Sequence, residues 1–535
     1  MLVHFLNNYI MNSNITNNII SRITLFLETT LPAVEARKGE LQSFLADGEF
    51  DDMISDAGKN ARQTPSIHME TGLLERVRKA GFGKFVRSFD AVTEDTTSES
   101  LKRAETLMTN DVEFTGDKRK LIAAAIRVHA ACKFPNYKFS PVTPEYVAEN
   151  QINKSASSGF PFFQRKGKVL AEILAQARHV LDFSWVEPFY WPITRGFRLQ
   201  IRKAVSGLAL KCRVMYPYPG CITILEGIFL IPFVHHFTQI DTFYVIGRSG
   251  GQISEWLERV FNNKKVGRIT SSDISSFDQN VLNIMTILSF GILRSQLQLT
   301  SNEHSVFVDV VKYFCVSLAV SREKGSPSYG FIKLHGVPSG SGFTNMIDTL
   351  VHAIALEYAI PGILEEQSTL ICGDDNIFDS TGVDYKRVEK IFLNELNLPI
   401  TPEKTHHYKS WQKIEFLGFI WINGVRMQDT TLLINQMVYH SSFRTDLDKF
   451  DRELARGASV LLNAQNGQDI FKKVFPDVLA VLQRGQDIRF FYLYGTQPPT
   501  TLPGVTGFTR LKGGVTVLPH INHSLSLHLK DGWLI

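Results

Sequence analysis

The chain has 535 residues, of which 44% are hydrophobic and 21% are charged. This length exceeds what one hydrophobic core usually serves, so several packed lobes are expected, and the composition excludes wholesale disorder. The 57 basic residues barely outnumber the 53 acidic ones, so the net charge of +4 does not favour a polybasic exterior, although it leaves room for a basic internal channel.

The cysteines and the apolar runs bear on the cellular compartment. The five cysteines form no CxxC pair and no zinc spacing, which favours free thiols in a reducing, cytosol-like space. The most apolar run, residues 221–237, is interrupted by Glu226, His235 and His236, whereas a membrane span needs about 20 apolar residues. A buried helix is therefore predicted there, no membrane segment is expected, and the first residues lack the features of a signal peptide.

Residues 1–265 alternate helical patterns with loops and one basic strand. Residues 1–110 are predicted to form a helical extension, and a helical pattern at 121–129 follows. Residues 153–161 (NKSASSGFP) form a loop by composition. Residues 208–214 favour a strand, on which Lys211 and Arg213 point the same way. A solvated face is the commoner arrangement for such cations; a phosphate site is the alternative, which Arg198, Arg202 and Lys203 would strengthen.

Residues 266–425 have the most regular pattern and predict an α+β arrangement. A strand at 266–270 and a polar turn to residue 278 precede a helix with apolar positions from 281 to 292. A Gly/Ser loop (residues 336–342) then opens a second helix. The remaining predicted elements are that helix at 343–354, a hairpin at 369–378, a helix at 385–398 and a strand at 414–421. The last 110 residues favour helices to about residue 485, then a Pro/Gly-rich tail.

An acidic turn, Gly373-Asp374-Asp375, lies between the two strands of the predicted hairpin. Taken alone, it is more often a plain turn, because glycine and aspartate favour turns for backbone reasons. Asp273 follows a predicted strand, and Asp278 lies where the next helix begins, so a helix N-cap is an alternative role for Asp278. If these carboxylates meet at the hairpin tip, they can share two metal ions about 4 Å apart that promote phosphoryl transfer.

Two further segments carry weaker signals. The Gly/Ser loop lets a backbone approach a ligand closely and leads into a helix N-terminus, which favours phosphate; a flexible linker is the alternative. Thr344 and Asp348 share one face of the following helix. Lys404 is a candidate proton donor to a leaving pyrophosphate, although a surface lysine is the commoner arrangement.

In chain order, seven segments resemble the motifs of the RNA-dependent RNA polymerases of positive- and double-stranded RNA viruses. Asp273 with Asp278 resembles motif A, Ser339-Gly340 with Thr344 resembles motif B, and the acidic turn resembles motif C, 101 residues after Asp273 (374 − 273). The segments that resemble motifs G, F, D and E are Ser158-Gly159-Phe160-Pro161, Lys211 with Arg213, Thr401 to Lys404, and Phe416-Leu417-Gly418. Residues 338–345 (PSGSGFTN) and the chain length are most similar to picobirnaviruses and partitiviruses.

The resemblance implies a right-handed fingers-palm-thumb polymerase, with an encircled active site and a small antiparallel palm sheet backed by helices. It implies Mg²⁺ or Mn²⁺ held by Asp273, Asp374 and, to a lesser degree, Asp375, with Lys404 as general acid. Template contacts are implied for Ser158, Gly159 and Pro161, and nucleotide contacts for Lys211, Arg213, Arg202, Asp278, Ser339, Gly340, Thr344, Asn345 and Asp348.

One residue departs from the family's pattern. Asp348 stands where picornavirus-like enzymes have an Asn that reads the ribose 2′-hydroxyl, and an Asn comes early, at Asn345. A hydroxyl can donate to a carboxylate as well as to an amide oxygen. The partner of the ribose therefore stays open among Asn345, Asp348 and Ser339.

The resemblance also implies a domain order and a biological setting. The domains are an N-terminal extension (1–110), fingers (111–265), palm (266–290 and 336–425), a fingers insertion (291–335) and a thumb with a C-terminal tail (426–535). The partners are RNA template, product strand and ribonucleoside triphosphates, with capsid protein as a candidate, in the virion interior or the host cytoplasm. A separate hypothesis rests on the composition of the tail after residue 496: its Pro, Gly and aromatic residues are expected to reach back into the product channel and support initiation without a primer.

Two other functions compete with this one. A reverse transcriptase shares the palm but usually has a bulky residue at the position of Asp278. A non-catalytic RNA-binding or capsid-interior protein would leave the three acidic positions unexplained.

Overall fold

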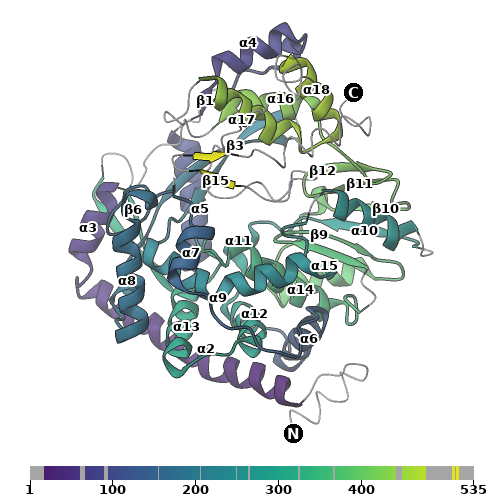
Figure 1. Ribbon diagram of the computed structural model, residues 1–535. Helices are drawn as coiled ribbons and strands as arrows, with labels where there is room; N and C mark the ends of the chain where they lie inside the picture. Colours follow the sequence, from purple (N-terminus) through teal and green to yellow (C-terminus); the bar gives the residue numbers. More distant parts are fainter. Residues whose placement is uncertain are drawn as a thin grey trace.

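The computed structural model describes residues 17–60, 67–89, 94–154, 156–204, 207–248, 250–262, 266–322, 326–365, 368–440, 449–476, 509–511 and 514–516. Helices and small sheets alternate along the chain, as the sequence predicts for an α+β protein. In Figure 1 the C-terminal helices gather with α4 at one pole of the molecule, and α2 crosses the opposite pole.

The sheet that carries the acidic positions is four-stranded and antiparallel. Its strands, in spatial order, are β10 (His406–Tyr408), β5 (Ile269–Ser272), β9 (Asp375–Asp379) and β8 (Thr369–Cys372). Because side chains alternate along a strand, its two faces enter different cores. Ile371 and Phe378 join the main core, and Leu370 and Ile377 join a smaller one.

Helices cover both faces of this sheet. α12 (Asn283–Gln296) and α14 (Thr344–Ala359) belong to the main core, and α10 (Gly250–Asn262) belongs to the smaller one. Nearly every residue of α14 after Asn345 is buried, because this helix lies inside the molecule. Two shorter helices complete this region, α11 (Phe277–Asn280) and α15 (Tyr385–Asn394).

Two predicted strands differ from the observed ones. The strand predicted at 266–270 is found at Ile269–Ser272, so that Asp273 follows it immediately. The single strand predicted at 414–421 is wrong, because the chain turns back between β11 (Lys413–Phe416) and β12 (Phe419–Ile422). Leu417 and Gly418 both have positive φ, 55° and 70°, which gives the tight reversal that a right-twisted hairpin needs. β13 (Val425–Met427) pairs with β12 in the same small sheet.

A long hairpin and a bundle of helices precede the sheet in sequence. The hairpin pairs β3 (Gly196–Ala204) with β4 (Gly207–Met215), which confirms the strand predicted at 208–214. The bundle consists of α6 (Lys118–Ala131), α7 (Pro144–Asn150), α8 (Leu170–Phe183) and α9 (Gly220–Gln239). Among the described helices, α9 alone is long and apolar enough to cross a membrane, but its apolar window is 72% buried inside the fold. This agrees with the predicted buried helix.

Residues 301–333 form a helix and a hairpin that pack against the N-terminal helices. α13 begins with a capping box, in which Thr300 and Glu303 satisfy each other's backbone N–H groups. The elements of this region are α13 (Ser301–Cys315), β2 (Ile193–Thr194), β6 (Ser317–Arg322), β7 (Ser328–Lys333), α2 (Asn17–Ala46), α3 (Asp51–Asn60) and α5 (Glu94–Thr109).

The C-terminal helices share a core with an N-terminal helix. α4 (Thr71–Lys79) contributes Leu73 and Val77 to the cluster built by the C-terminal helices, and β1 (His68–Met69) pairs with β14 (Tyr439–His440). Those helices are α16 (Thr430–Val438), α17 (Lys449–Leu461) and α18 (Gln465–Val474). Gln436 of α16 also donates to the Ile201 carbonyl of β3 at 3.1 Å, so this cluster reaches across to the long hairpin.

The predicted tail lies almost entirely outside the described residues. Only β15 (Thr509–Leu511) and β16 (Gly514–Thr516), which pair as a hairpin, are described after residue 476. The helices predicted between residues 477 and 485 and the proposed reach of the tail therefore stay predictions.

Candidate active site

The acidic turn is a two-residue turn whose backbone is hydrogen-bonded to side chains of α14. Cys372 pairs with Asp375, so Gly373 and Asp374 form the turn, and Gly373 has φ +62°. The Gly373 amide donates to Thr349 Oγ1, and the Gly373 carbonyl bonds His352 Nδ1, both at 2.9 Å. Two side chains of one buried helix therefore fix both polar groups of the Gly373 backbone.

The histidine in this support is neutral and has one defined tautomer. Asn376 Nδ2 donates to His352 Nε2 at 2.7 Å, so Nδ1 carries the proton that goes to the Gly373 carbonyl. Burial lowers the pKa of His352 to about 4, which keeps the ring uncharged at neutral pH. Ser272 bonds the same Asn376 amide, so the support extends to the end of β5.

Pairing of β5 with β9 brings the other predicted carboxylate to the same edge. Ser272 lies opposite Asn376, so Asp273 emerges next to Asp375. Burial and the charge of Asp273 raise the pKa of Asp374, and burial and the charge of Asp374 raise the pKa of Asp375 to about 7. The three carboxylates therefore lie close enough to repel one another, as the sequence predicts.

The arrangement fits a divalent cation whose remaining ligands come from substrate. Among the described residues, no three His, Cys, Asp or Glu side chains converge as a complete metal cage. Magnesium is commonly held by one or two carboxylates together with substrate phosphates, so a complete protein cage is not required. Clustered carboxylates whose pKa values are raised by burial and by mutual repulsion are the donor set that such an ion would stabilise.

Four cations share one face of the long hairpin, which we call the basic face: Arg198, Arg202, Lys211 and Arg213. The register pairs Arg198 with Arg213 and Gln200 with Lys211, and places Arg202 two residues farther along β3 on the same side. Burial lowers the pKa of Arg202, and the charges of Asp375 and Asp374 oppose that shift. In turn, the charges of Arg213 and Arg202 oppose the rise that burial causes in the pKa values of the two aspartates. The basic face therefore looks toward the acidic turn rather than only into solvent.

Lys404 lies at the end of a short 3-10 helix, Pro402–Lys404, beside the first acidic residue. Its Nζ donates to Asp273 Oδ2 at 2.7 Å, and its side chain is 60% exposed. The Asp273 carbonyl also accepts from the Thr401 amide at 2.8 Å, which fixes this segment against the end of β5. The lysine is therefore within reach of the acidic site and is not an unrelated surface residue.

The Gly/Ser loop packs on the backbone of the motif A segment. The Val337 amide donates to the Asp278 carbonyl at 2.5 Å, and Gly336 has φ +85° where a Cβ would lie 2.8 Å from that carbonyl. Asp278 lies inside α11 rather than at its N-cap, which is Ser276, so the N-cap alternative is wrong. Burial and the charge of Asp374 raise the pKa of Asp278 to about 6.

The candidate ribose readers lie at different depths. Asn345 is exposed, whereas Asp348 is buried under the acidic turn, and its Cβ is 3.9 Å from a Cβ built on Gly373. Asp348 Oδ1 has no hydrogen-bond partner among the described residues. Burial and the charge of Asp278 raise the pKa of Asp348 well above its usual range. Thr344, half-buried, uses its hydroxyl to donate to the Pro338 and Ser341 carbonyls of the loop.

The predicted template residues form a tight loop that we call the template loop, residues 156–166. Ser158 is fully buried and its hydroxyl accepts from the Gln164 amide, so this hydroxyl works within the loop. Gly159 has φ +61°, and a Cβ there would lie 2.5 Å from the Tyr218 carbonyl. Half-buried Pro161 follows in the same loop. Contact of this loop with template stays a prediction.

Sequence reasoning missed the residues that support the turn, namely Thr349, His352 and Asn376. The available signal was the presence of polar side chains, Thr349 and His352 among them, in a helix whose other positions are mainly apolar. Polar groups buried in such a helix need partners, although the sequence alone does not name them.

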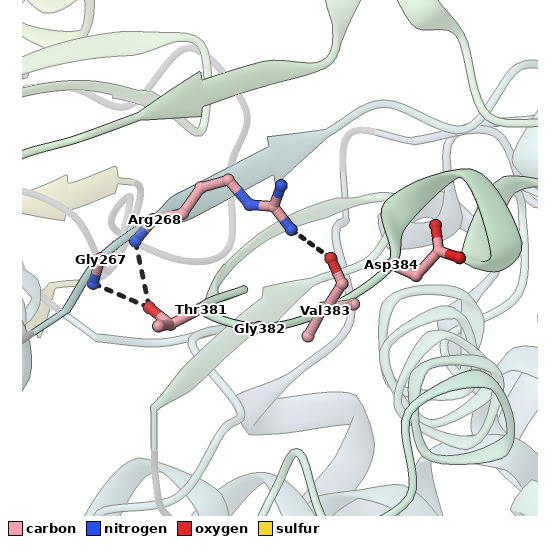
Figure 2. Close-up of a pocket in the computed structure, with 6 residues that line it drawn as sticks. All are labelled: Gly267, Arg268, Thr381, Gly382, Val383 and Asp384. Carbon is pink, nitrogen blue, oxygen red and sulfur yellow. Dashed lines mark hydrogen bonds between the residues drawn. The ribbon is translucent and has the colours of Figure 1, made fainter.

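One surface depression lies away from this site, with a volume of about 460 Å³. Figure 2 shows its lining residues, Gly267, Arg268, Thr381, Gly382, Val383 and Asp384. Arg268 donates to the Val383 carbonyl, and Asp384 caps α15 by accepting from the Arg387 amide. Gly267 and Arg268 precede β5, whereas Asp273 follows it, so the depression is at the opposite end of the strand from the acidic turn.

Comparison with known proteins identifies the family. A family model described as viral RNA-dependent RNA polymerase matches residues 130–483. The RNA-directed RNA polymerase of Cryptosporidium parvum virus 1 (strain KSU-1) is 27% identical over 330 residues, which cover 57% of this chain and 58% of that protein. The chain thus aligns with less than two thirds of that relative's length.

Solved structures confirm the predicted fold class. The RNA-dependent RNA polymerase of a human picobirnavirus matches with a TM-score of 0.57 over 88% of this chain and 85% of that one, at 16% identity. Its insertion-loop deletion mutant matches with a TM-score of 0.58 over 86% and 87%, also at 16% identity. The family model, the curated relative and the shared fold agree with the motifs read from the sequence. The chain therefore belongs to the viral RNA-dependent RNA polymerases.

Proposed function

We propose that this chain copies a viral RNA template with ribonucleoside triphosphates, and so replicates and transcribes the viral genome by two-metal-ion nucleotidyl transfer. One observation supports this most directly. Asp273, Asp374 and Asp375 meet at one sheet edge, and the four cations of the basic face look toward that edge. The carboxylates can bind a metal ion, and the cations opposite them can bind a polyanion. Together the two sets suit a metal-bound triphosphate.

Each group has a role in the transfer. Asp273 and Asp374, with Asp375 contributing less, would hold Mg²⁺ or Mn²⁺, which when bound activates the primer 3′-hydroxyl and stabilises the leaving pyrophosphate. Lys211, Arg213 and Arg202 would neutralise the triphosphate. The primer 3′-hydroxyl would lose its proton to water, and its oxygen would form a bond to the α-phosphorus as the bond to pyrophosphate breaks. Lys404 Nζ would donate a proton to the leaving pyrophosphate.

Template-directed synthesis tests this proposal. The purified chain with an RNA template, a primer and Mg²⁺ should incorporate the ribonucleotide complementary to each template base, and omission of that nucleotide should stop extension. Efficient incorporation of deoxyribonucleotides instead would support a reverse transcriptase. Binding of RNA without any incorporation would support a non-catalytic RNA-binding protein, and either result would overturn the proposal.

Ribose selection should depend on Asp278 more than on the charge of Asp348. Asp278→Ala should raise the ratio of deoxyribonucleotide to ribonucleotide incorporation by about tenfold, because one buried polar contact is worth about 1–2 kcal/mol. Asp348→Asn should preserve selection, since a protonated carboxyl and an amide can make similar hydrogen bonds. Competition assays with paired nucleotides measure the ratio. Loss of selection in Asp348→Asn but not in Asp278→Ala would reverse this assignment.

The two faces of the long hairpin provide a matched test of triphosphate binding. Lys211→Ala on the basic face should raise the KM for nucleotides by about tenfold, as expected for one charged contact worth about 1.5 kcal/mol. Lys203→Ala, an exposed cation on the opposite face of the same hairpin, should change KM by less than about twofold. Equal effects of the two substitutions in steady-state kinetics would show that only overall charge matters.

Partners and setting remain part of the proposal. RNA template, product strand and nucleotides follow from the proposed reaction, and capsid protein is the candidate protein partner in the virion interior or host cytoplasm. Protection of the polymerase from added protease inside intact virus particles would support the first location, and its digestion there would exclude it.

A further inference from the structure

Two buried side chains of opposite charge lie between the template loop and the Gly/Ser loop, each bonded through a different contact. Glu226 of α9 has no exposed surface, and Lys166 at the end of the template loop is 8% exposed. Lys166 Nζ donates to Thr223 Oγ1 at 3.1 Å, one turn before Glu226 on the same helix. Burial raises the pKa of Glu226 to about 7, and the two donors from the Gly/Ser loop and the charge of Lys166 oppose that shift. The sequence pattern shows this glutamate only as an interruption of an apolar run.

Both oxygens of Glu226 are used by the Gly/Ser loop. Ser341 Oγ donates to Oε1 at 2.6 Å, and the Gly342 amide donates to Oε2 at 2.7 Å. The same Ser341 hydroxyl accepts from the Phe343 amide at 3.0 Å, at the point where α14 begins. The carboxylate therefore fixes the end of the loop that leads into the helix beneath the acidic turn.

The geometry favours a carboxylate over an amide. Glutamine would present an N–H to Ser341 Oγ, which already accepts from the Phe343 amide, so the serine hydroxyl would have to turn its proton away from its present acceptor. A buried carboxylate without compensation is strongly unfavourable, so the charge of Lys166 and the two donors must offset its desolvation. Lys166 belongs to the template loop, since its amide donates to the Ala156 carbonyl at 2.8 Å.

We propose that Glu226 and Lys166 are positioning residues that lock the template loop and the Gly/Ser loop into one unit. Neither side chain lies among the groups assigned to substrate. They act through Ser341 and Gly342, which belong to the same loop as Ser339 and Gly340. By fixing this loop, they position the incoming nucleotide relative to the template. This inference rests on the proposed function.

A double-mutant cycle tests the lock between the glutamate and the loop. Glu226→Gln should lower kcat/KM for the templated nucleotide by about 10- to 100-fold, the range for one buried charged hydrogen bond, mainly through a higher KM. Ser341→Ala should lower it by about tenfold, and the double variant should be no worse than Glu226→Gln alone. Independent, multiplicative losses would overturn the link.

The lysine supplies the second half of the test. Lys166→Met, a change in the template loop, should raise the nucleotide KM and also weaken equilibrium binding of template RNA. Combining it with Glu226→Gln should recover part of the loss, because no buried charge then remains unpaired. A double variant worse than Lys166→Met alone would contradict the pairing.

A buried glutamate elsewhere in the fold serves as the structural control. Glu357 accepts from the Gly362 and Leu364 amides and pairs with Arg127 Nε at 2.7 Å, so it matches Glu226 in burial and in holding two loop donors but touches neither loop. Glu357→Gln should lower the melting temperature without raising the nucleotide KM. If it raises KM as Glu226→Gln does, general destabilisation explains both and the inference fails.

The inference and the proposed function can fail separately. If the unaltered chain extends primers but the Glu226 and Lys166 variants keep its KM, only the inference is wrong. If the unaltered chain does not polymerise, the proposed function is wrong. The contact between the two loops can then still be tested by hydrogen exchange. The backbone amides of residues 339–343 should exchange faster in Lys166→Met than in Glu357→Gln. Equal exchange would overturn the lock as well.

Discussion

Asp374→Asn is expected to reduce template-directed ribonucleotide incorporation by about 10³-fold, whereas Asp375→Asn should cost about 10- to 100-fold. Asparagine keeps the size of the side chain but removes the charge that a metal ion needs. Asp374 lies at the tip of the turn, and Asp375 is the first residue of β9, paired with Cys372. Although the register puts Asp273 opposite Asp375, the charge of Asp273 is the largest charge effect on the pKa of Asp374 and only the second on that of Asp375, which favours Asp374 as the residue that shares an ion with Asp273.

A matched control lies on the same strand. Asp379 ends β9 at its far end from the acidic turn and accepts from the Thr381 amide, so Asp379→Asn makes the same chemical change away from the site. It should keep incorporation within about twofold in single-turnover primer extension, as expected for a surface change away from special features. Undiminished incorporation by Asp374→Asn would remove the catalytic assignment of the acidic turn.

The same variant should be more stable than the unaltered chain when metal is absent. The raised carboxylate pKa values mean that the folded chain binds protons more tightly than the unfolded chain. The carboxylates therefore destabilise the folded state at high pH, and this destabilisation is relieved as pH falls through about 7 for Asp375 and about 6 for Asp278.

Thermal unfolding measures this effect. At pH 8 with a chelator, Asp374→Asn should melt above the unaltered chain, and added Mg²⁺ should raise the melting temperature of the unaltered chain more than that of the variant. A lower melting temperature for the variant without metal would show that Asp374 serves the fold rather than the site.

Local periodicity predicted the elements that carry the site. The alternation around Lys211 and Arg213 placed both cations on one face, and the apolar spacing after the Gly/Ser loop gave α14. The reversal at Leu417 and Gly418 was missed, because the apolar alternation of β11 continues across the turn into β12 and a leucine at positive φ is unusual.

Contacts between distant segments could not be read from local patterns. α4 joins the core of the C-terminal helices although more than 350 residues separate Leu73 from Leu433. Similarly, the acidic turn could be recognised, but the support of its backbone by Thr349 and His352 could not. A buried polar residue signals that a partner exists, and only the folded chain shows which residue it is.

Gly340→Ala is expected to lower kcat/KM for the templated nucleotide by about 100-fold, because a displacement of about 1 Å in a site can cost that much. A Cβ on Gly340 would lie 2.0 Å from the Tyr216 carbonyl oxygen and 3.0 Å from the Tyr218 amide nitrogen. These are backbone atoms just after the long hairpin, so they cannot rotate away as a side chain could. The Gly/Ser loop must move, and the bond from the Tyr216 amide to Ser339 Oγ must lengthen.

Gly342, two residues along the same loop, is the matched control for this substitution. A Cβ there meets only Leu230 Cδ2 at 3.4 Å and Glu226 atoms at 3.5 Å or more, which are ordinary contacts, and its backbone does not require glycine. Gly342→Ala should therefore keep kcat/KM within about threefold, since a strain-free change costs little. Comparable losses in both variants would mean that the loop tolerates no added side chain anywhere. A fully active Gly340→Ala would mean that its close approach to Tyr216 is not needed to place the nucleotide.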